Sequence, residues 1–153
     1  MTKRKISYIE FTLTQITNLP ENYKHKSLIS IGSNLGERQK YIESAIEEIK
    51  KIPTQILAMS KILETKALDV TDQPDFLNCI IAIETTLEPL LLLEKLQQIE
   101  RNLGRIKRFE KGPREIDLDI LTYDELVMAD DKLTLPHHSI KTRPFIKELM
   151  SEL

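Results

Sequence analysis

The stretch FLNCIIAIETTL, residues 76–87, is the clearest strand signal in the chain, and it decides the fold. Such a continuous apolar run is typical of a buried strand. Pro89 follows it and suits the first turn of a helix, whereas Gly104 suits the C′ position beyond a helix end. Between them, the apolar stripe of the predicted helix consists of Leu92, Leu96, Ile99 and Leu103.

Upstream of this unit, the sequence predicts a strand at 27–32, which the turn GSNLG ends. A helix is expected over 37–51 because apolar residues recur there at helical spacing. Pro53 stops that helix, and a second strand is predicted at 56–65, followed by a loop at 66–75. The apolar face of the helix consists of Ile42, Ala45, Ile46 and Ile49.

Downstream, a polar and basic loop at 105–114 leads into a strand at roughly 115–123. The end of the chain predicts a turn around Pro136 and a short terminal helix. At the other end, ISYIEFTLT (6–14) alternates and predicts one further strand, which a polar connection at 18–26 joins to the rest.

Without that N-terminal strand, the order is β-α-β-β-α-β, the ferredoxin-like order. We therefore expect an α+β fold with an antiparallel sheet, helices on one face and an extra N-terminal strand. The length of 153 residues favours a single domain over 1–153, with an extension at 1–26 and a core at 27–153.

Composition excludes several classes of protein. A net charge of −2 argues against a nucleic-acid partner, and no apolar run approaches the ~20 residues that span a bilayer. The N-terminus lacks the continuous apolar segment of a signal peptide, so a cytoplasmic location is expected. The lone Cys79 lies in an apolar run and is interpreted as a core thiol.

A second stretch, GPREIDLDIL (112–121), carries the candidate chemistry. On a strand, alternate side chains share a face, so the apolar residues of this stretch face a core. Asp117 and Asp119 then point together to the other side. At ~7 Å and an effective dielectric of ~20, two such charges repel by roughly 2–3 kcal/mol. The strand needs something that relieves this repulsion.

Three explanations are open for paired carboxylates on a strand: solvated charges, ion pairs with nearby arginines, or ligands of a divalent metal. The preceding segment favours the metal, because magnesium binds one or two carboxylates together with phosphate oxygens, and arginine forks bind phosphate. Glu110 is the only acid in this otherwise basic segment. Its cations are Arg101, Arg105, Lys107, Arg108, Lys111 and Arg114.

The segment LPHHSIKTRPF (135–145) extends the cationic region with Lys141 and Arg143. His137 and His138 lack the partner residues of a zinc site. They could form a structural pair at a turn, or act as neutral hydrogen-bond donors to phosphate.

Five motifs occur in order along residues 27–145: ISIGSNLG, DQPDFLNCIIAIET, LQQIERNLGR, GPREIDLDIL and LTLPHHSIKTRPF. Together they resemble the 6-hydroxymethyl-7,8-dihydropterin pyrophosphokinase family, diphosphotransferases of EC class 2.7.6. The resemblance implies transfer of the β,γ-pyrophosphoryl group of ATP to the pterin hydroxymethyl oxygen, with release of AMP, in folate biosynthesis. It implies two Mg²⁺ ions, ATP as co-substrate and a monomer without nucleic-acid or membrane partners.

The resemblance also assigns residues. Asp117 and Asp119 would ligate the metal and, with Arg105 and Arg114, form the catalytic set. The expected ATP-binding residues are Gln97, Glu100, Arg105, Lys107, Arg114, Ile120, Lys132, Thr134, His137, His138 and Arg143. The expected pterin-binding residues are Thr65, Leu68, Phe76, Asn78 and Phe145.

Several positions depart from the family pattern. Lys111 stands where a tryptophan is frequent, the loop at 105–114 is one residue shorter than in a well-known bacterial form, and Phe76 replaces a common tyrosine. His138 stands where an aromatic residue is frequent. Two other functions stay open from the residues alone: a non-enzymatic ferredoxin-like binding module, and a metal-dependent phosphotransferase that would release ADP instead of AMP.

Overall fold

The computed structural model describes residues 24–67 and 70–153, with β1 (His25–Ser33) at the centre of its main sheet. β1 pairs with β4 (Phe76–Thr85) on one side and with β5 (Asp117–Tyr123) on the other. β2 (Thr54–Met59) and β3 (Leu63–Thr65) both pair with β4, so the strand order is β2-β4-β1-β5 with β3 also beside β4. Every pairing is antiparallel, as the sequence predicts.

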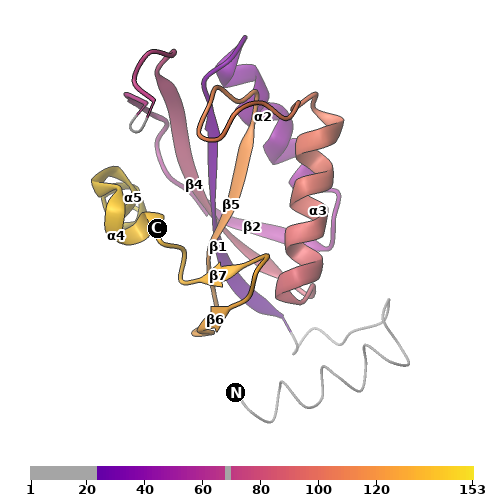
Figure 1. The fold of residues 1–153 in the computed structure, drawn as a ribbon. Helices are drawn as coiled ribbons and strands as arrows, with labels where there is room; N and C mark the ends of the chain where they lie inside the picture. Colours follow the sequence, from indigo (N-terminus) through magenta and orange to yellow (C-terminus); the bar gives the residue numbers. More distant parts are fainter. Residues whose placement is uncertain (1–23, 68–69) are drawn as a thin grey trace.

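α2 (Arg38–Ile49) and α3 (Pro89–Asn102) cover one face of this sheet (Figure 1). Their predicted apolar stripes are inside: Ile42 and Ile49 of α2 and Leu92 and Leu96 of α3 are fully buried. They belong to one cluster with alternate residues of the strands, including Ile31, Ile81 and Leu118. The period-2 and period-3.6 patterns of the sequence therefore meet in one core.

The opposite face of the sheet has a smaller core under the end of the chain. α4 (Ser139–Thr142) and α5 (Pro144–Met150) lie there (Figure 1), and Ile146 and Leu149 pack against Ile80 of β4 and Leu121 of β5. The terminal helix is confirmed, and it lies on the face opposite to α2 and α3, the two core helices expected to share one face. Since β4 and β5 are apolar on both faces, a second cover is required.

The strand predicted at 56–65 is interrupted. β2 ends at Met59 and β3 begins at Leu63, because Ser60 enters the ladder with its side chain. The Ile80 backbone N–H donates to Ser60 Oγ at 2.9 Å, while the Ser60 N–H donates to the Ile80 carbonyl at 2.9 Å. A polar side chain that competes with backbone pairing ends regular structure at this point.

The end of α3 aims the arginine that follows it. Gly104 has a φ of +97°, which a glycine adopts without steric cost, and its N–H donates to the Arg101 carbonyl. The Arg105 N–H reaches back to the Glu100 carbonyl at 3.0 Å. These two bonds form a Schellman motif, as the C′ glycine predicts, and they bring Arg105 back beside Glu100.

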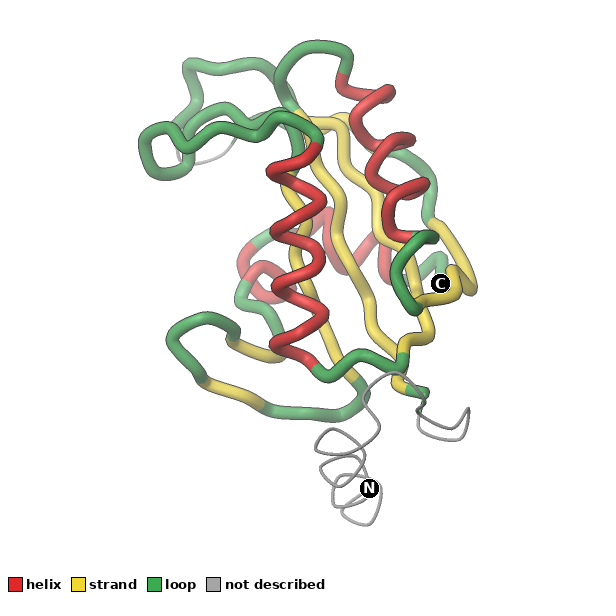
Figure 2. Tube along the Cα trace, turned by 90° about the vertical axis from the view of Figure 1, so that its right-hand side faces the viewer, coloured by secondary structure: helices red, strands yellow, loops and turns green. Residues whose placement is uncertain are grey.

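A small antiparallel pair, β6 (Met128–Ala129) with β7 (Thr134–Leu135), follows β5. Figure 2 shows the loops after α3 and before β4 gathered at the same end of the sheet. The strand predicted at 6–14 lies outside the described residues. Among the helices of the described part, none has the length and apolar character to span a bilayer.

Candidate active site

The register of the sheet places the two aspartates beside Gly32, a residue without a side chain. Asp117 lies opposite Gly32 of β1, and Gly32 in turn lies opposite Asn78 of β4. Asp119 lies opposite Ser30 in the same way. Because residues in one row of an antiparallel sheet share a face, both carboxylates and Asn78 point to the same side, as the strand pattern predicts.

Asp117 is held by two guanidinium groups. Arg105 Nη1 donates to Oδ1 at 3.0 Å, and Arg114 Nη1 donates to Oδ2 at 2.6 Å. Burial lowers the pKa of Arg105, but the charges of Asp117 and Glu100 outweigh it and raise that pKa. Ion pairing with arginines, one of the three open explanations, is therefore correct for Asp117.

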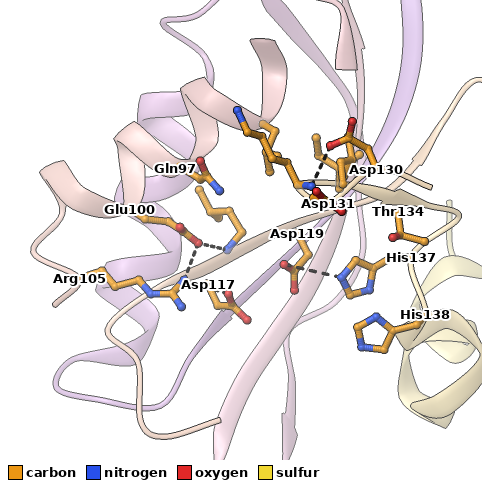
Figure 3. Close-up of a pocket in the computed structure, with 15 residues that line it drawn as sticks. Gln97, Glu100, Arg105, Asp117, Asp119, Asp130, Asp131, Thr134, His137 and His138 are labelled. Atoms are coloured by element: carbon orange, nitrogen blue, oxygen red, sulfur yellow. Dashed lines mark hydrogen bonds and ion pairs between the residues drawn. The ribbon is translucent and has the colours of Figure 1, made fainter. Parts of the chain in front are cut away.

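Glu100 is buried, although its place on the polar side of α3 suggests a solvated residue. Its Oε2 accepts the Leu118 N–H at 2.7 Å and an Arg105 N–H at 2.8 Å. Burial raises the pKa of Glu100 to about 7, although both donors oppose the shift. Glu100 thus fixes β5 between the two aspartates and orients Arg105 toward Asp117 (Figure 3).

Asp119 has a different environment from Asp117. His137 Nε2 lies 3.9 Å from its Oδ1 (Figure 3), and 38% of its side-chain surface remains open to the pocket. Burial among protein atoms raises the pKa of Asp119 to about 8, and the neighbouring carboxylates of Asp117 and Glu100 add to the shift. The repulsion inferred from the sequence therefore adds to the effect of burial at Asp119.

His137 is arranged as a neutral donor. The Ser139 backbone N–H, which can only donate, points to His137 Nδ1 at 3.2 Å. Nδ1 is therefore the acceptor, and the single proton of the neutral ring lies on Nε2, the atom that faces Asp119. Burial and His138, whose ring stacks at 4.4 Å, lower the pKa of His137 and favour this neutral form.

A polar pocket of about 390 Å³ opens between α3, β5 and the β6–β7 pair (Figure 3). Eight of the predicted ATP-binding residues line it: Gln97, Glu100, Arg105, Ile120, Lys132, Thr134, His137 and His138. The acidic pair also lines it. Sequence reasoning missed five further lining residues: Leu93, Leu118, Asp130, Asp131 and Leu133.

An aromatic pocket of about 220 Å³ lies on the other side of the acidic pair. Phe76, Asn78 and Phe145, predicted for the pterin, all line it, together with Arg114, whose guanidinium lies 5.6 Å from the centre of the Phe76 ring. Arg143, predicted for ATP, lines this pocket and not the polar one. The residues missed here are Ser30, Gly32, Lys111, Ser139 and Ile146.

Asn78 is oriented by a neighbouring strand. Its Nδ2 donates to Thr65 Oγ1 at 2.7 Å, so Thr65 supports the pocket through Asn78 and is not among its lining residues. A Cβ atom on Gly32 would lie 3.1 Å from Asn78 Oδ1, which means that the glycine keeps this part of the pocket open. Leu68, the fifth predicted pterin residue, lies outside the described residues.

The basic loop, residues 105–114, encloses a third hollow of about 860 Å³ against α3. Lys107, predicted for ATP, lines this hollow and not the polar pocket. Arg108 anchors the loop through two bonds to Glu115, at 2.8 and 2.6 Å. The Phe109 side chain at the loop tip is 63% exposed.

Some of the missed residues carry a signal in the sequence. Gly32 interrupts an apolar strand, and glycine inside a strand often marks a close approach of a ligand or backbone. Asp130 and Asp131 belong to a short turn whose position beside β5 follows only from the β6–β7 pairing. No pattern in the sequence predicts that placement.

The residues of the acidic pair fit magnesium. Both supply carboxylate oxygens, which this hard cation prefers, and Asp119 faces the open pocket with its charged form disfavoured. A divalent cation at this point would reverse that effect, because it stabilises the ionised carboxylate. A bound cation would therefore supply the positive charge that the ionised carboxylates of this strand need.

Comparison with known proteins identifies the family of the chain. Residues 28–153 match the family model for 7,8-dihydro-6-hydroxymethylpterin-pyrophosphokinase. The chain is 36% identical over 126 residues to the 2-amino-4-hydroxy-6-hydroxymethyldihydropteridine pyrophosphokinase of Pseudomonas aeruginosa. The match covers 82% of this chain and 78% of that protein.

Two longer proteins also match. The Folic acid synthesis protein fol1 of Schizosaccharomyces pombe is 41% identical over 128 residues, 82% of this chain but only 18% of that protein. The mitochondrial Folate synthesis bifunctional protein of Pisum sativum is 39% identical over 126 residues, 82% of this chain and 24% of that protein. The chain therefore belongs to the 7,8-dihydro-6-hydroxymethylpterin-pyrophosphokinase family, the diphosphotransferases that move pyrophosphate from ATP to hydroxymethyldihydropterin in folate synthesis.

Proposed function

We propose that this chain itself transfers the β,γ-pyrophosphoryl group of ATP to 6-hydroxymethyl-7,8-dihydropterin, and that Asp117 and Asp119 hold two Mg²⁺ ions for this reaction. The observation that carries the proposal is the place where the two pockets meet. Asp117, Asp119, His137 and His138 line both the polar pocket and the aromatic pocket. Substrates in the two pockets would therefore meet at the carboxylates.

The two pockets suit different substrates. The polar pocket offers Lys132, Thr134 and histidine donors to a nucleotide and its phosphates. The aromatic pocket offers the faces of Phe76 and Phe145 to a flat ring, and Asn78 to its polar edge. A planar heterocycle is oriented by aromatic side chains that contact its faces and by a small number of polar groups at its edge.

The reaction is a displacement at the β-phosphorus. The hydroxymethyl oxygen loses its proton and bonds to that phosphorus, and the bond from the phosphorus to the oxygen that bridges to the α-phosphate breaks, which releases AMP and one proton. Bound magnesium supplies charge neutralisation on the phosphate oxygens. Arg105 and Arg114 add fixed positive charge, and the Nε2 proton of His137 is placed to donate to an oxygen. Positioning and electrostatics carry phosphoryl transfer generally.

Product identity tests the proposal. Protein is incubated with ATP, Mg²⁺ and 6-hydroxymethyl-7,8-dihydropterin, and nucleotides are separated by chromatography. We expect AMP and the pterin diphosphate in equal amounts, and neither without the pterin. ADP in place of AMP would indicate an ordinary kinase, and no nucleotide turnover would favour a binding module.

We further propose a ferredoxin-like core, a single domain, a monomeric state and a cytoplasmic location. The β2-β4-β1-β5 order supports a ferredoxin-like core, and the family match over 28–153 supports one domain with its core at 27–153. A monomer in the cytoplasm is the expected state. Size-exclusion chromatography with light scattering tests the monomer, and localisation of the tagged full chain tests the cytoplasmic location.

A further inference from the structure

Asn34, in the GSNLG turn after β1, makes a buried set of hydrogen bonds that the proposed reaction does not use. Its side chain has no exposed surface. Oδ1 accepts the Arg114 N–H at 2.8 Å, and the Asn34 backbone N–H donates to the Arg114 carbonyl at 3.1 Å. Nδ2 donates to Gln73 Oε1 at 2.9 Å and to the Pro74 carbonyl at 3.0 Å.

Gln73 continues this connection. It belongs to the segment before β4, residues 70–75, which leads directly into Phe76 of the aromatic pocket. Its Nε2 donates to the Lys111 carbonyl at 3.0 Å and to the Val70 carbonyl at 2.7 Å. The two amide side chains, Asn34 and Gln73, thus form a bridge between the segment before β4 and the basic loop.

The bridge ends at Arg114, which lines the aromatic pocket and donates to Asp117, a residue that lines both pockets. Arg114 donates to Asp117 and lies over the Phe76 ring, and its Nε donates to the Gly112 carbonyl at 3.2 Å. Its backbone is fixed on both sides by Asn34, and Lys111, three residues earlier, is held by Gln73. The guanidinium position therefore depends on hydrogen bonds made outside either pocket.

We propose that Asn34 and Gln73 are positioning residues, whose amide bridge holds Arg114 where the polar and aromatic pockets meet. The inference rests on the proposed function for its effect on rate. Gln73 acts through Arg114, because neither Gln73 nor Asn34 lines either pocket.

A double-mutant cycle tests this dependence. Gln73→Ala removes the whole side-chain link, and Gln73→Glu keeps an acceptor for Asn34 but removes the donor to Lys111. We expect each to lower kcat by about 5- to 20-fold in the wild-type background. In an Arg114→Ala background we expect each substitution to lower kcat less than twofold, because the effects of residues that act through the same group are not additive.

The matched control is Gln55→Ala, an exposed amide on β2, a strand that lines neither pocket. It should leave kcat unchanged in both backgrounds. Equal losses for Gln73→Ala with and without Arg114 would overturn the inference, because a purely structural residue behaves that way. The wild type would still release AMP in that case, so the proposed function would survive.

A second measurement does not depend on turnover. Amide hydrogen exchange reports how firmly the Arg114 N–H is held. We expect Gln73→Ala to speed exchange at Arg114 at least fivefold, and Gln55→Ala to leave it unchanged. Unchanged exchange in the Gln73 variants would show that the bridge does not hold the loop, and the proposal would be wrong even if the reaction is confirmed.

Discussion

The polar pocket and the aromatic pocket meet at the same two carboxylates but are built from different material. The polar pocket ends in exposed side chains of the β6–β7 pair, among them Lys132 and Thr134. The aromatic pocket is set into the middle of the sheet, around Gly32 and the buried Phe76. In the proposed reaction, a phosphate chain would therefore bind to exposed, mobile side chains, whereas a flat ring would bind in a pocket of fixed shape.

The shared carboxylates should matter most for rate. Asp119→Asn removes a proposed metal ligand that serves both substrates, so we expect kcat to fall by roughly 10³-fold, the scale of several kcal/mol of lost charge stabilisation. Release of AMP measures the rate, and circular dichroism checks the fold. A variant with near-normal turnover would contradict the role of this carboxylate.

Arg114 lies at the same junction, and its loss should rank second. We expect Arg114→Ala to lower kcat by about 10²-fold, because a fixed positive charge at the phosphates is lost. Arg114→Lys should recover only part of the rate, since lysine lacks the planar fork. Full recovery with lysine would mean that the reaction needs only the positive charge and not the planar guanidinium.

Gly32 tests the aromatic pocket alone. Gly32→Ala places a methyl group 3.1 Å from Asn78 Oδ1, where the amide must shift. We expect the KM for the pterin to rise roughly 10-fold, a cost on the scale of about 1–3 kcal/mol for overpacking. The KM for ATP should change less than twofold. Equal effects on both substrates would remove the distinction between the pockets.

Lys132 tests the polar pocket, with a smaller effect. Its side chain is exposed, so solvent screens its charge. We expect Lys132→Ala to raise the KM for ATP about threefold and to leave the pterin KM unchanged. Initial rates at low and high salt provide the check, because added salt should shrink the difference between variant and wild type.

The last prediction concerns stability without metal, not rate. Asp119 ionises near pH ~4 in an unfolded chain, but the fold raises its pKa to about 8. Between these values the folded protein holds a proton that the unfolded chain releases, so stability falls as pH rises.

The asparagine of the Asp119→Asn variant cannot ionise. The stability of the variant relative to the wild type should therefore increase from pH 5 to pH 8 when a chelator is present. We expect a difference of about 1 kcal/mol, because solvent at the partly exposed side chain screens the charge. Thermal melts at the two pH values measure it. A constant difference between variant and wild type would indicate that Asp119 ionises normally.

The contrast between the pockets also marks how far sequence could predict this protein. Apolar periodicity placed both long helices and the central strands, and the alternation in GPREIDLDIL placed the two aspartates on one face. Those features depend on local repeats of 2 and 3.6 residues. Most of the ATP and pterin residues came from the family resemblance, and the structure brings many of them together in two pockets.

Other features depend on contacts between distant segments, which no local pattern encodes. Glu100 reads as a solvated residue but is buried against Leu118, and Ser60 splits a strand by bonding across to Ile80. The C-terminal helices cover a sheet face because Ile80 and Leu121 are apolar on that side. The amide bridge at Asn34 joins three loops that are far apart in sequence.

The most direct test of the account counts metal ions at the acidic pair. Mn²⁺, in place of Mg²⁺, is titrated by electron paramagnetic resonance into protein saturated with a non-hydrolysable ATP analogue. We predict two bound ions per chain for the wild type and the loss of at least one in Asp119→Asn, with the nucleotide still bound. Two ions bound equally tightly in the variant would contradict the central claim.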